Sequence, residues 1–158
     1  MKGKTKMKKT KFLRVLALIM ALCIGCIILI GCHKEDKDPN DSCIVVLGNE
    51  QQTAYTVKLD GLTLDKGLLS VLDYLKEKEN LTYECDVSGF LTRVGDVAQD
   101  TEAGKYIYIY TSEQKDQDVS QYASTITYNG SQLVSTGVGS KDMTIKDGTI
   151  IYIGTIVW

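Results

Sequence analysis

A row of tyrosines is the group of side chains in this sequence best suited to bind a ligand. Tyr106, Tyr108 and Tyr110 alternate with Ile107 and Ile109. Alternate side chains of a β-strand point to the same face, so the rings would share one face and the isoleucines the other. Such rings suit a planar ligand, a sugar or a partner protein, but tyrosine also favours strands for packing alone. Both interpretations stay open from the sequence.

A stretch of small residues, Ser135 to Gly139, follows further along the chain. It lacks the Gly-Lys-[Ser/Thr] ending and the following helix of a phosphate-binding loop, and we expect a tight turn between strands. Backbone without large side chains lets a ligand approach closely. We therefore expect any small-molecule site to combine this turn with the tyrosine row, through the residues Tyr106, Tyr108, Tyr110, Ser135, Gly137 and Gly139.

Residues for catalysis or metal binding are scarce. The only histidine, His33, directly follows Cys32, and a Ser or Cys nucleophile usually needs such a base held in a fixed position. Glu113, Asp116 and Asp118 could surround a hard cation, but they lack the Gly turn and distal Glu of a calcium loop. We expect these acids to lie in a solvated loop. We therefore predict no enzyme, no metal site and no resident cofactor.

The first 31 residues have the composition of a secretory signal. They contain seven of the 18 basic residues and no acid, and the 16 residues 15–30 are almost wholly apolar. The sequence Leu29-Ile30-Gly31-Cys32 resembles the bacterial lipobox, in which the cysteine receives a lipid and the chain is cleaved before it. An uncleaved anchor is the alternative, but a membrane-spanning helix needs about 20 apolar residues. We predict a lipoprotein signal peptide at 1–31 and a lipid on Cys32, which would anchor the chain outside the bacterial cell membrane.

The remaining chain is acidic and divides into two parts. Residues 32–42 are polar, contain the only proline and predict a flexible tether. Residues 43–158 have the length of one domain. Removal of 1–31 leaves 11 basic and 20 acidic residues, a formal charge of −9. This charge argues against nucleic acid as a partner, because nucleic-acid binding requires a basic surface.

Two cysteines remain in the predicted domain. Cys43 and Cys85 could form a disulfide, which persists in an extracytoplasmic compartment. They could equally be free thiols buried in strands. The sequence leaves the two alternatives open.

Hydrophobic periodicity predicts one helix among many strands. Apolar residues recur at helical spacing over 65–79, with Thr63 as the expected N-cap. Strands are expected at 44–47, 54–59, 81–87, 90–94, 105–111, 124–128, 132–135 and 149–158. Asn129-Gly130 predicts a type I′ hairpin. The last strand is apolar on both faces and should lie in the centre of a sheet. The fold class is α+β, with one amphipathic helix packed on a mostly antiparallel sheet.

The order of these segments resembles the transcobalamin-like C-terminal domain family, the bacterial relatives of the β-domain of transcobalamin and intrinsic factor. The resemblance covers about 57–158 and rests on the segments Gly61–Leu64, Leu68–Leu72, Leu81–Glu84, Gly89–Asp96, Tyr106–Tyr110, Ser135–Gly139, Met143–Ile145 and Lys146–Ile150. It implies a β-grasp-like domain that covers one side of a corrinoid while a separate helical barrel holds the other. This chain differs from many members in having Tyr and Ile rather than Trp in the aromatic strand, and it carries an acidic insertion at 113–122.

Two functions follow as hypotheses. The first is a lipid-anchored binding module on a bacterial surface, for a corrinoid or another small ligand, acting with a partner chain that supplies the missing helical part. The alternative is an envelope protein-interaction or structural module with no small-molecule ligand. An acidic surface and exposed tyrosines on a tethered domain suit both hypotheses.

Overall fold

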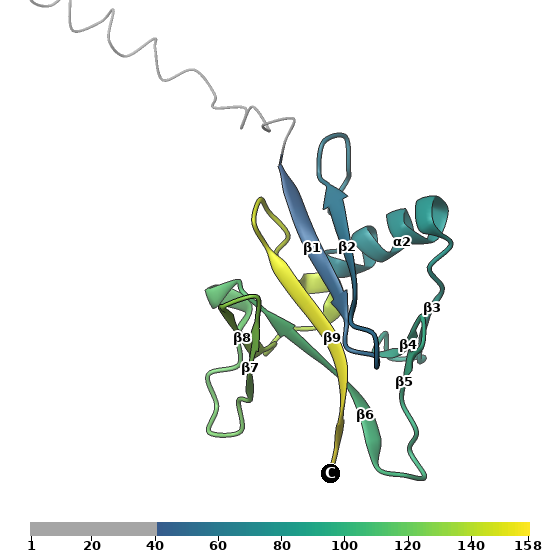
Figure 1. Cartoon of the computed structure of the whole chain (residues 1–158), viewed down its shortest axis with the longest axis vertical. Coiled ribbons are helices and arrows are strands. Elements are labelled where there is room, and N and C mark those ends of the chain that lie inside the picture. Colours follow the sequence, from purple (N-terminus) through teal and green to yellow (C-terminus); the bar gives the residue numbers. More distant parts are fainter. Residues whose placement is uncertain (1–40) are drawn as a thin grey trace, which may run out of the picture. The chain divides into compact units, whose positions relative to one another are not determined.

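The computed structural model describes residues 41–158 (Figure 1). The predicted signal peptide at 1–31, the lipidation site Cys32 and nearly all of the tether at 32–42 therefore lie outside the described residues. Within the described part, no helix has the length and hydropathy needed to cross a membrane. The elements in chain order are β1 (Ser42–Leu47), β2 (Thr53–Lys58), α2 (Leu68–Glu79), β3 (Tyr83–Cys85), β4 (Leu91–Val94), β5 (Val97–Ala98), β6 (Lys105–Thr111), the 3₁₀ helix η1 (Gln114–Asp116), β7 (Thr125–Tyr128), β8 (Ser131–Ser135), the 3₁₀ helix η2 (Ser140–Asp142) and β9 (Ile150–Val157).

The main sheet has six strands in the order β2-β1-β9-β6-β8-β7. The pair β1–β9 is parallel and the other neighbouring pairs are antiparallel. The last strand of the chain thus lies inside the sheet, as predicted. The burial of one face falls towards the C-terminus, however: Ile151 and Ile153 are fully buried, whereas Val157 on the same face is 68% exposed. Together with one α-helix, this sheet confirms the α+β class.

Helix α2 covers one face of the main sheet (Figure 1). Four residues of the apolar stripe of the helix are buried, and they pack in one cluster with Ile151 and Ile153 of β9: Leu68, Val71, Leu72 and Leu75. Burial of this apolar stripe is the main reason that a helix of this length is stable, because short helices are marginal alone.

The start of α2 differs from the prediction. The residue that precedes the helix is Gly67 rather than Thr63, and no side chain caps the first turn. Gly67 has a φ of 51°, and a Cβ there would lie 2.6 Å from the carbonyl oxygen of Met143. Only glycine fits both this backbone conformation and this close approach of the 141–143 segment. Tertiary packing therefore sets the helix start.

Strands β3, β4 and β5 form a separate small sheet in that order. They are shorter than the predicted strands at 81–87 and 90–94. Tyr83 of β3 donates a hydrogen bond of 2.6 Å from its hydroxyl to Asp73 of α2. Burial, followed by this hydrogen bond, raises the pKa of Tyr83 to about 12. The small sheet is thus joined to the helix by a polar contact as well as by chain connectivity.

The hairpins follow the turn signals of the sequence. The turn at 48–52 joins β1 to β2 as an antiparallel pair, and Asn129-Gly130 joins β7 to β8. Asn129 and Gly130 have φ values of 47° and 82°, which are the positive angles that a type I′ turn requires. The hairpin prediction at 124–135 is therefore confirmed.

The two cysteines of the described residues are free. Cys43 of β1 is fully buried in the core, while Cys85 of β3 is exposed. The disulfide considered from the sequence is therefore not present in the structure. Burial raises the pKa of the Cys43 thiol to about 11, and burial followed by the negative charges of Asp86 and Asp73 raises the pKa of Cys85.

Candidate functional site

Strand β6 has one fully paired edge and one that is partly open. Its register with β9 pairs Tyr106 with Ile156 and Tyr108 with Gly154. The Trp158 amide donates a hydrogen bond to the Gly104 carbonyl, and this bond shows that the even-numbered residues of β6 direct their backbone groups to β9. Backbone groups of alternate residues point to opposite edges of a strand. The tyrosines of β6 therefore bond to β9, and Ile107 and Ile109 direct their N–H and C=O groups to the other edge.

The second edge is bonded only at its two ends. Lys105 exchanges two backbone hydrogen bonds of 2.8 Å with Asp100, and the Ile109 carbonyl accepts one of 2.9 Å from the Thr136 amide. Beyond Ile109, Tyr110 and Thr111 pair with β8. Within residues 41–158, the N–H and C=O of Ile107 and the N–H of Ile109 have no backbone partner. A β-edge with free donors and acceptors is a template for another extended segment or for a ligand with amide groups.

A groove with a volume of about 710 Å³ lies along this open edge. This volume is within the range of pockets that bind small molecules. Its walls come from β6, from the small sheet and its flanking turns, and from the loop after β8. The lining residues are Asp86, Phe90, Leu91, Gln99, Thr101, Tyr106, Ile107, Tyr108, Ile109, Thr136, Gly137, Val138, Gly139 and Ser140.

The groove brings together four of the six residues predicted for a ligand site. Tyr106, Tyr108, Gly137 and Gly139 line it, whereas Tyr110 and Ser135 do not. Ser135 is buried within β8, where its hydroxyl accepts a 3.1 Å hydrogen bond from the Ser124 amide. The predicted tyrosine row and glycine loop do meet. The turn expected at 135–139 is in fact a longer loop that leads into η2.

The row of tyrosines is not uniformly available. Tyr110 is only 8% exposed, and its hydroxyl accepts a 3.3 Å hydrogen bond from the Ser124 hydroxyl. Its ring lies 5.5 Å from that of Tyr108 and 6.2 Å from that of Tyr152. Tyr106, in contrast, is 40% exposed. The two interpretations of the tyrosine row, packing and binding, therefore apply to different ends of one strand. Tyr110 is packed, and Tyr106 is accessible.

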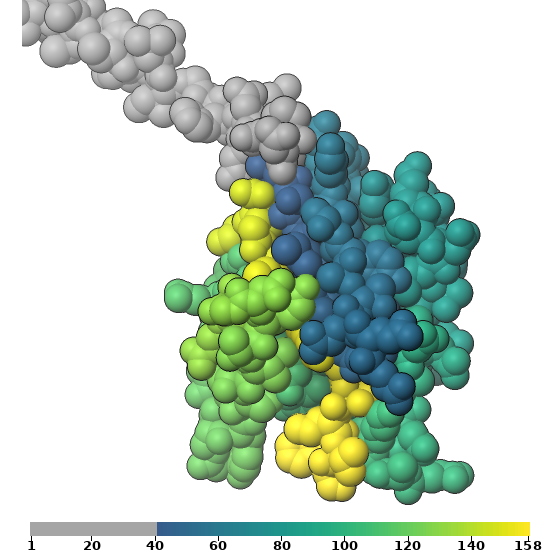
Figure 2. Space-filling view, viewed as in Figure 1, coloured from purple at the N-terminus to yellow at the C-terminus, as the bar shows by residue number. Residues whose placement is uncertain are grey.

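The β7–β8 hairpin explains why this end of the row is covered. Tyr128 of β7 lies 6.4 Å from Tyr152 of β9 between ring centres. Figure 2 shows the green surface of the hairpin region beside the blue and yellow surfaces of the central strands. The hairpin folds over the sheet face opposite the helix and leaves the Tyr106 end outside.

A buried carboxylate holds the loop that forms one wall of the groove. Asp116 of η1 is 4% exposed; its carboxylate accepts hydrogen bonds from both the amide and the hydroxyl of Thr144. Its backbone carbonyl accepts a 2.9 Å hydrogen bond from the Gly137 amide and a 3.1 Å bond from the Thr136 hydroxyl. One aspartate therefore fixes both ends of the 136–144 segment.

Glu113 is held in the same way. It is 8% exposed, accepts a 3.0 Å hydrogen bond from the Thr149 hydroxyl, and forms a 2.8 Å ion pair with Lys146. This hydrogen-bonded pair raises the pKa of Lys146. The expectation that Glu113 and Asp116 lie in a solvated loop is wrong, because each finds donors in the segment before β9. Their charges are satisfied internally, which buried carboxylates require.

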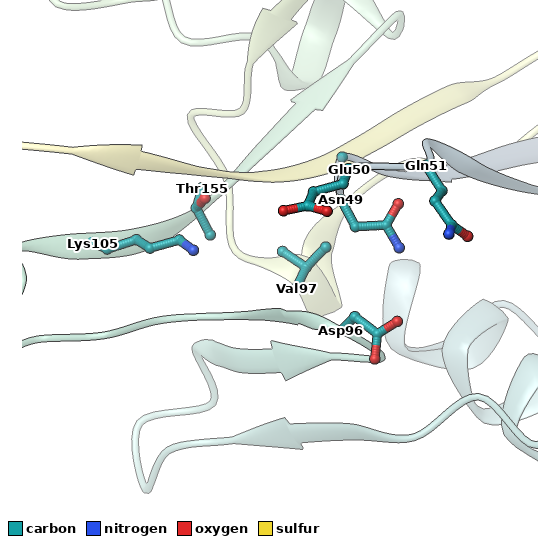
Figure 3. Close-up of a pocket in the computed structure, with 8 residues that line it drawn as sticks. Asn49, Glu50, Gln51, Asp96, Val97, Lys105 and Thr155 are labelled. Atoms are coloured by element: carbon teal, nitrogen blue, oxygen red, sulfur yellow. The ribbon is translucent and has the colours of Figure 1, made fainter.

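A second pocket, of about 430 Å³, lies at the start of β6. Figure 3 shows Asn49 and Glu50 of the β1–β2 turn on one side, Asp96 of the β4–β5 turn on another, and the Lys105 side chain ending beside Thr155. Val97 is the only large apolar side chain in its lining, and Lys105 makes no ion pair within the described residues. Its polar walls offer a ligand little apolar surface, so the groove is the better candidate.

Several groove residues were missed from the sequence. Phe90 is 66% exposed at the groove, and its amide donates to the Asp86 carboxylate across a short turn. An aromatic residue next to a Ser-Gly turn was a usable signal. Gln99 and Val138 gave no such signal, because their position at the groove depends on how three separate segments of the chain pack together. Among residues 41–158, no cluster of His, Cys, Asp or Glu is arranged to hold a metal ion.

Comparisons with known proteins add little to this geometry. No protein-family profile matches the chain, and no curated protein matches it. Among solved structures, it is similar to a "putative metal binding protein" from Ruminococcus gnavus ATCC 29149, known from a crystal structure at 1.30 Å resolution. The sequence identity is 16% and the TM-score is 0.45, with 75% of this chain and 98% of that chain covered. A likeness of this size carries no argument about function.

Proposed function

We propose that the chain is a lipid-anchored, extracytoplasmic binding module of a bacterial surface, and that the groove beside β6 is its ligand site. One observation carries the choice of site: the groove combines exposed rings, glycine backbone and free main-chain groups of one strand edge. Apolar walls with a few polar groups that fix orientation are what small-molecule sites have in common. The lipobox-like sequence at 29–32 supports the anchor.

The first ligand to test is a corrinoid. The proposal takes this ligand from the resemblance to the transcobalamin-like C-terminal domain family, whose β-grasp-like fold we also propose for this chain. The free N–H and C=O of Ile107 and the free N–H of Ile109 would suit the amide side chains that surround a corrin ring. In this proposal, a helical barrel on a partner chain would complete the site.

The test is a spectral titration of the full chain, purified in detergent, with cobalamin and cobinamide. We expect a saturable change in the corrinoid absorbance at concentrations up to about 1 mM, which corresponds to weak binding of about −4 kcal/mol. Tyr106→Ala should weaken binding, because Tyr106 lines the groove and is 40% exposed. Tyr55→Ala, on β2 and outside the groove, is the matched control. Absence of any change with either corrinoid would contradict the corrinoid proposal.

The anchor has its own test. Cys32→Ala expressed in a bacterium should abolish lipidation and cleavage before residue 32. Mass spectrometry of the unaltered protein should find a diacylated N-terminal cysteine. A chain that still begins at Met1 and carries no lipid would contradict the lipoprotein proposal.

A further inference from the structure

The open edge of β6 faces a split between two strands that are joined by a turn. Strands β5 and β6 are connected through 99–104, and the turn is closed by the two hydrogen bonds between Asp100 and Lys105. Past this point the strands diverge, since β5 pairs only with β4 and β6 pairs with β9 and β8. Figure 1 shows β5 and β6 running apart from their shared turn. The groove occupies this split, with Gln99 and Leu91 on one wall and Ile107 on the other.

The free groups of β6 are spaced as a strand would need them. The Ile107 N–H, the Ile107 C=O and the Ile109 N–H face the groove along one line, and residues two apart on a strand lie about 6.6 Å apart. A neighbouring extended segment bonds to alternate residues at this repeat. Three main-chain hydrogen bonds to one short segment are therefore available without any change in β6.

The charge around the groove restricts which segment fits. The only charged side chain that lines it is Asp86, and Asp100 and Glu102 are exposed in the adjoining turn. Residues 41–158 hold nine basic and 17 acidic side chains. A basic segment would be attracted to this surface, and an acidic one would be repelled.

We propose that the groove accepts a short, extended, basic segment of a partner protein, which adds as a strand to the free edge of β6 between β5 and the loop at 136–140. This inference rests on the proposed function, because it uses the same groove and names the class of ligand. The closed ends at Lys105 and Thr136 limit the added strand to about three or four residues at 3.3 Å each. Apolar side chains at alternate positions of the segment would pack against Phe90 and Val138.

The probe is a capped peptide with the sequence Lys-Val-Lys-Val-Lys, bound to the full chain in detergent. Two peptides are matched controls: Glu-Val-Glu-Val-Glu, and the lysine peptide with both valine amides N-methylated, which keeps the charge and removes main-chain donors. Amide hydrogen exchange is followed residue by residue. We expect the lysine peptide at saturation to slow exchange at Ile107 and Ile109 by about tenfold, with no change at Tyr108, whose amide already bonds to β9.

Each outcome of this experiment either supports or overturns strand addition. Slower exchange at Ile107 and Ile109 with the lysine peptide, together with loss of this effect for the N-methylated and acidic peptides, supports strand addition. Equal effects of the three peptides, or exchange that is unchanged at saturation or up to about 1 mM peptide, overturns it. Corrinoid titration of the same preparation separates the two proposals, since a corrinoid that binds in the groove when the peptide does not overturns this inference alone.

Discussion

The main sheet has one face whose two halves are covered very differently. Beneath α2, Ile151 and Ile153 of β9 are fully buried. On the neighbouring strand β6, Ile107 and Ile109 belong to the same face but are only partly buried. The residue type and the strand geometry are the same, so the difference in burial comes from what covers each pair of isoleucines. The helix covers the first pair, and a groove lies above the second.

This difference separates stability from binding. The covered half contains the helix stripe and the parallel pair β1–β9, and it supplies the buried apolar area that stabilises the fold. The open half leaves apolar surface and main-chain groups exposed next to a loop that the buried Asp116 carboxylate holds in place. A site of this kind needs a rigid support to keep its shape. The covered half provides that support.

The largest predicted effect is on the covered half. Leu72→Ala removes a side chain with no exposed surface and should lower the free energy of unfolding by about 2–5 kcal/mol. Ile107→Ala, on the open half, should cost clearly less, because its side chain is only partly buried. Urea denaturation of both variants measures this. Equal losses, or a loss below about 0.5 kcal/mol for Leu72→Ala, would contradict the assignment of the core.

The buried Cys43 and the exposed Cys85 should differ in how much they contribute to the pH dependence of stability. The Cys43 thiol is buried, and its folded pKa of about 11 is above the unfolded value of 9.0. The folded state therefore favours the protonated thiol. The contribution of this thiol to the free energy of unfolding is fully present below pH 9 and is lost between about pH 9 and 11. The loss should be about 2–3 kcal/mol.

Stability curves of two variants isolate this contribution. Cys43→Ala should show a shallower decline over this pH window than the unaltered chain, while Cys85→Ala, at an exposed site, should keep most of the decline. Parallel curves for Cys43→Ala and the unaltered chain would contradict burial of the thiol.

Asp116 should affect both stability and binding, because its buried carboxylate holds the loop that forms a groove wall. Asp116→Ala removes the acceptor of the Thr144 amide and hydroxyl and should cost about 1–3 kcal/mol, the usual consequence of leaving buried donors without a partner. It should also weaken ligand binding, since the loop at 136–144 forms a groove wall. Asp118→Ala is the control, because that carboxylate bonds only to the nearby Ser120. If Asp118→Ala proved as costly as Asp116→Ala, the buried carboxylate would not be the anchor of the loop.

Local patterns in the sequence predicted the elements well. The apolar spacing of the helix, the Asn129-Gly130 turn and the alternation of Tyr and Ile in β6 each depend on neighbours in the chain. The helix start was mispredicted because the close approach of Met143 to Gly67 is a contact between distant segments. The burial of Glu113 and Asp116 was missed for the same reason, since their donors lie about 30 residues further along.

The site was predictable only in part. The glycines of the loop and the accessible tyrosine follow from residue types, and they do line one groove. The split between β5 and β6 could not be predicted, because it arises where two sheets separate after a shared turn. The free groups of Ile107 and Ile109 follow from that separation rather than from any property of isoleucine.

The most direct test of the open edge is amide hydrogen exchange of the chain without ligand. We expect slow exchange at Tyr106 and Tyr108, whose amides bond to β9, and fast exchange at Ile107 and Ile109, whose amides face the groove. This alternation within one strand would not arise if both edges were paired. Slow exchange at all four residues would show that the edge is closed and would contradict the proposed site.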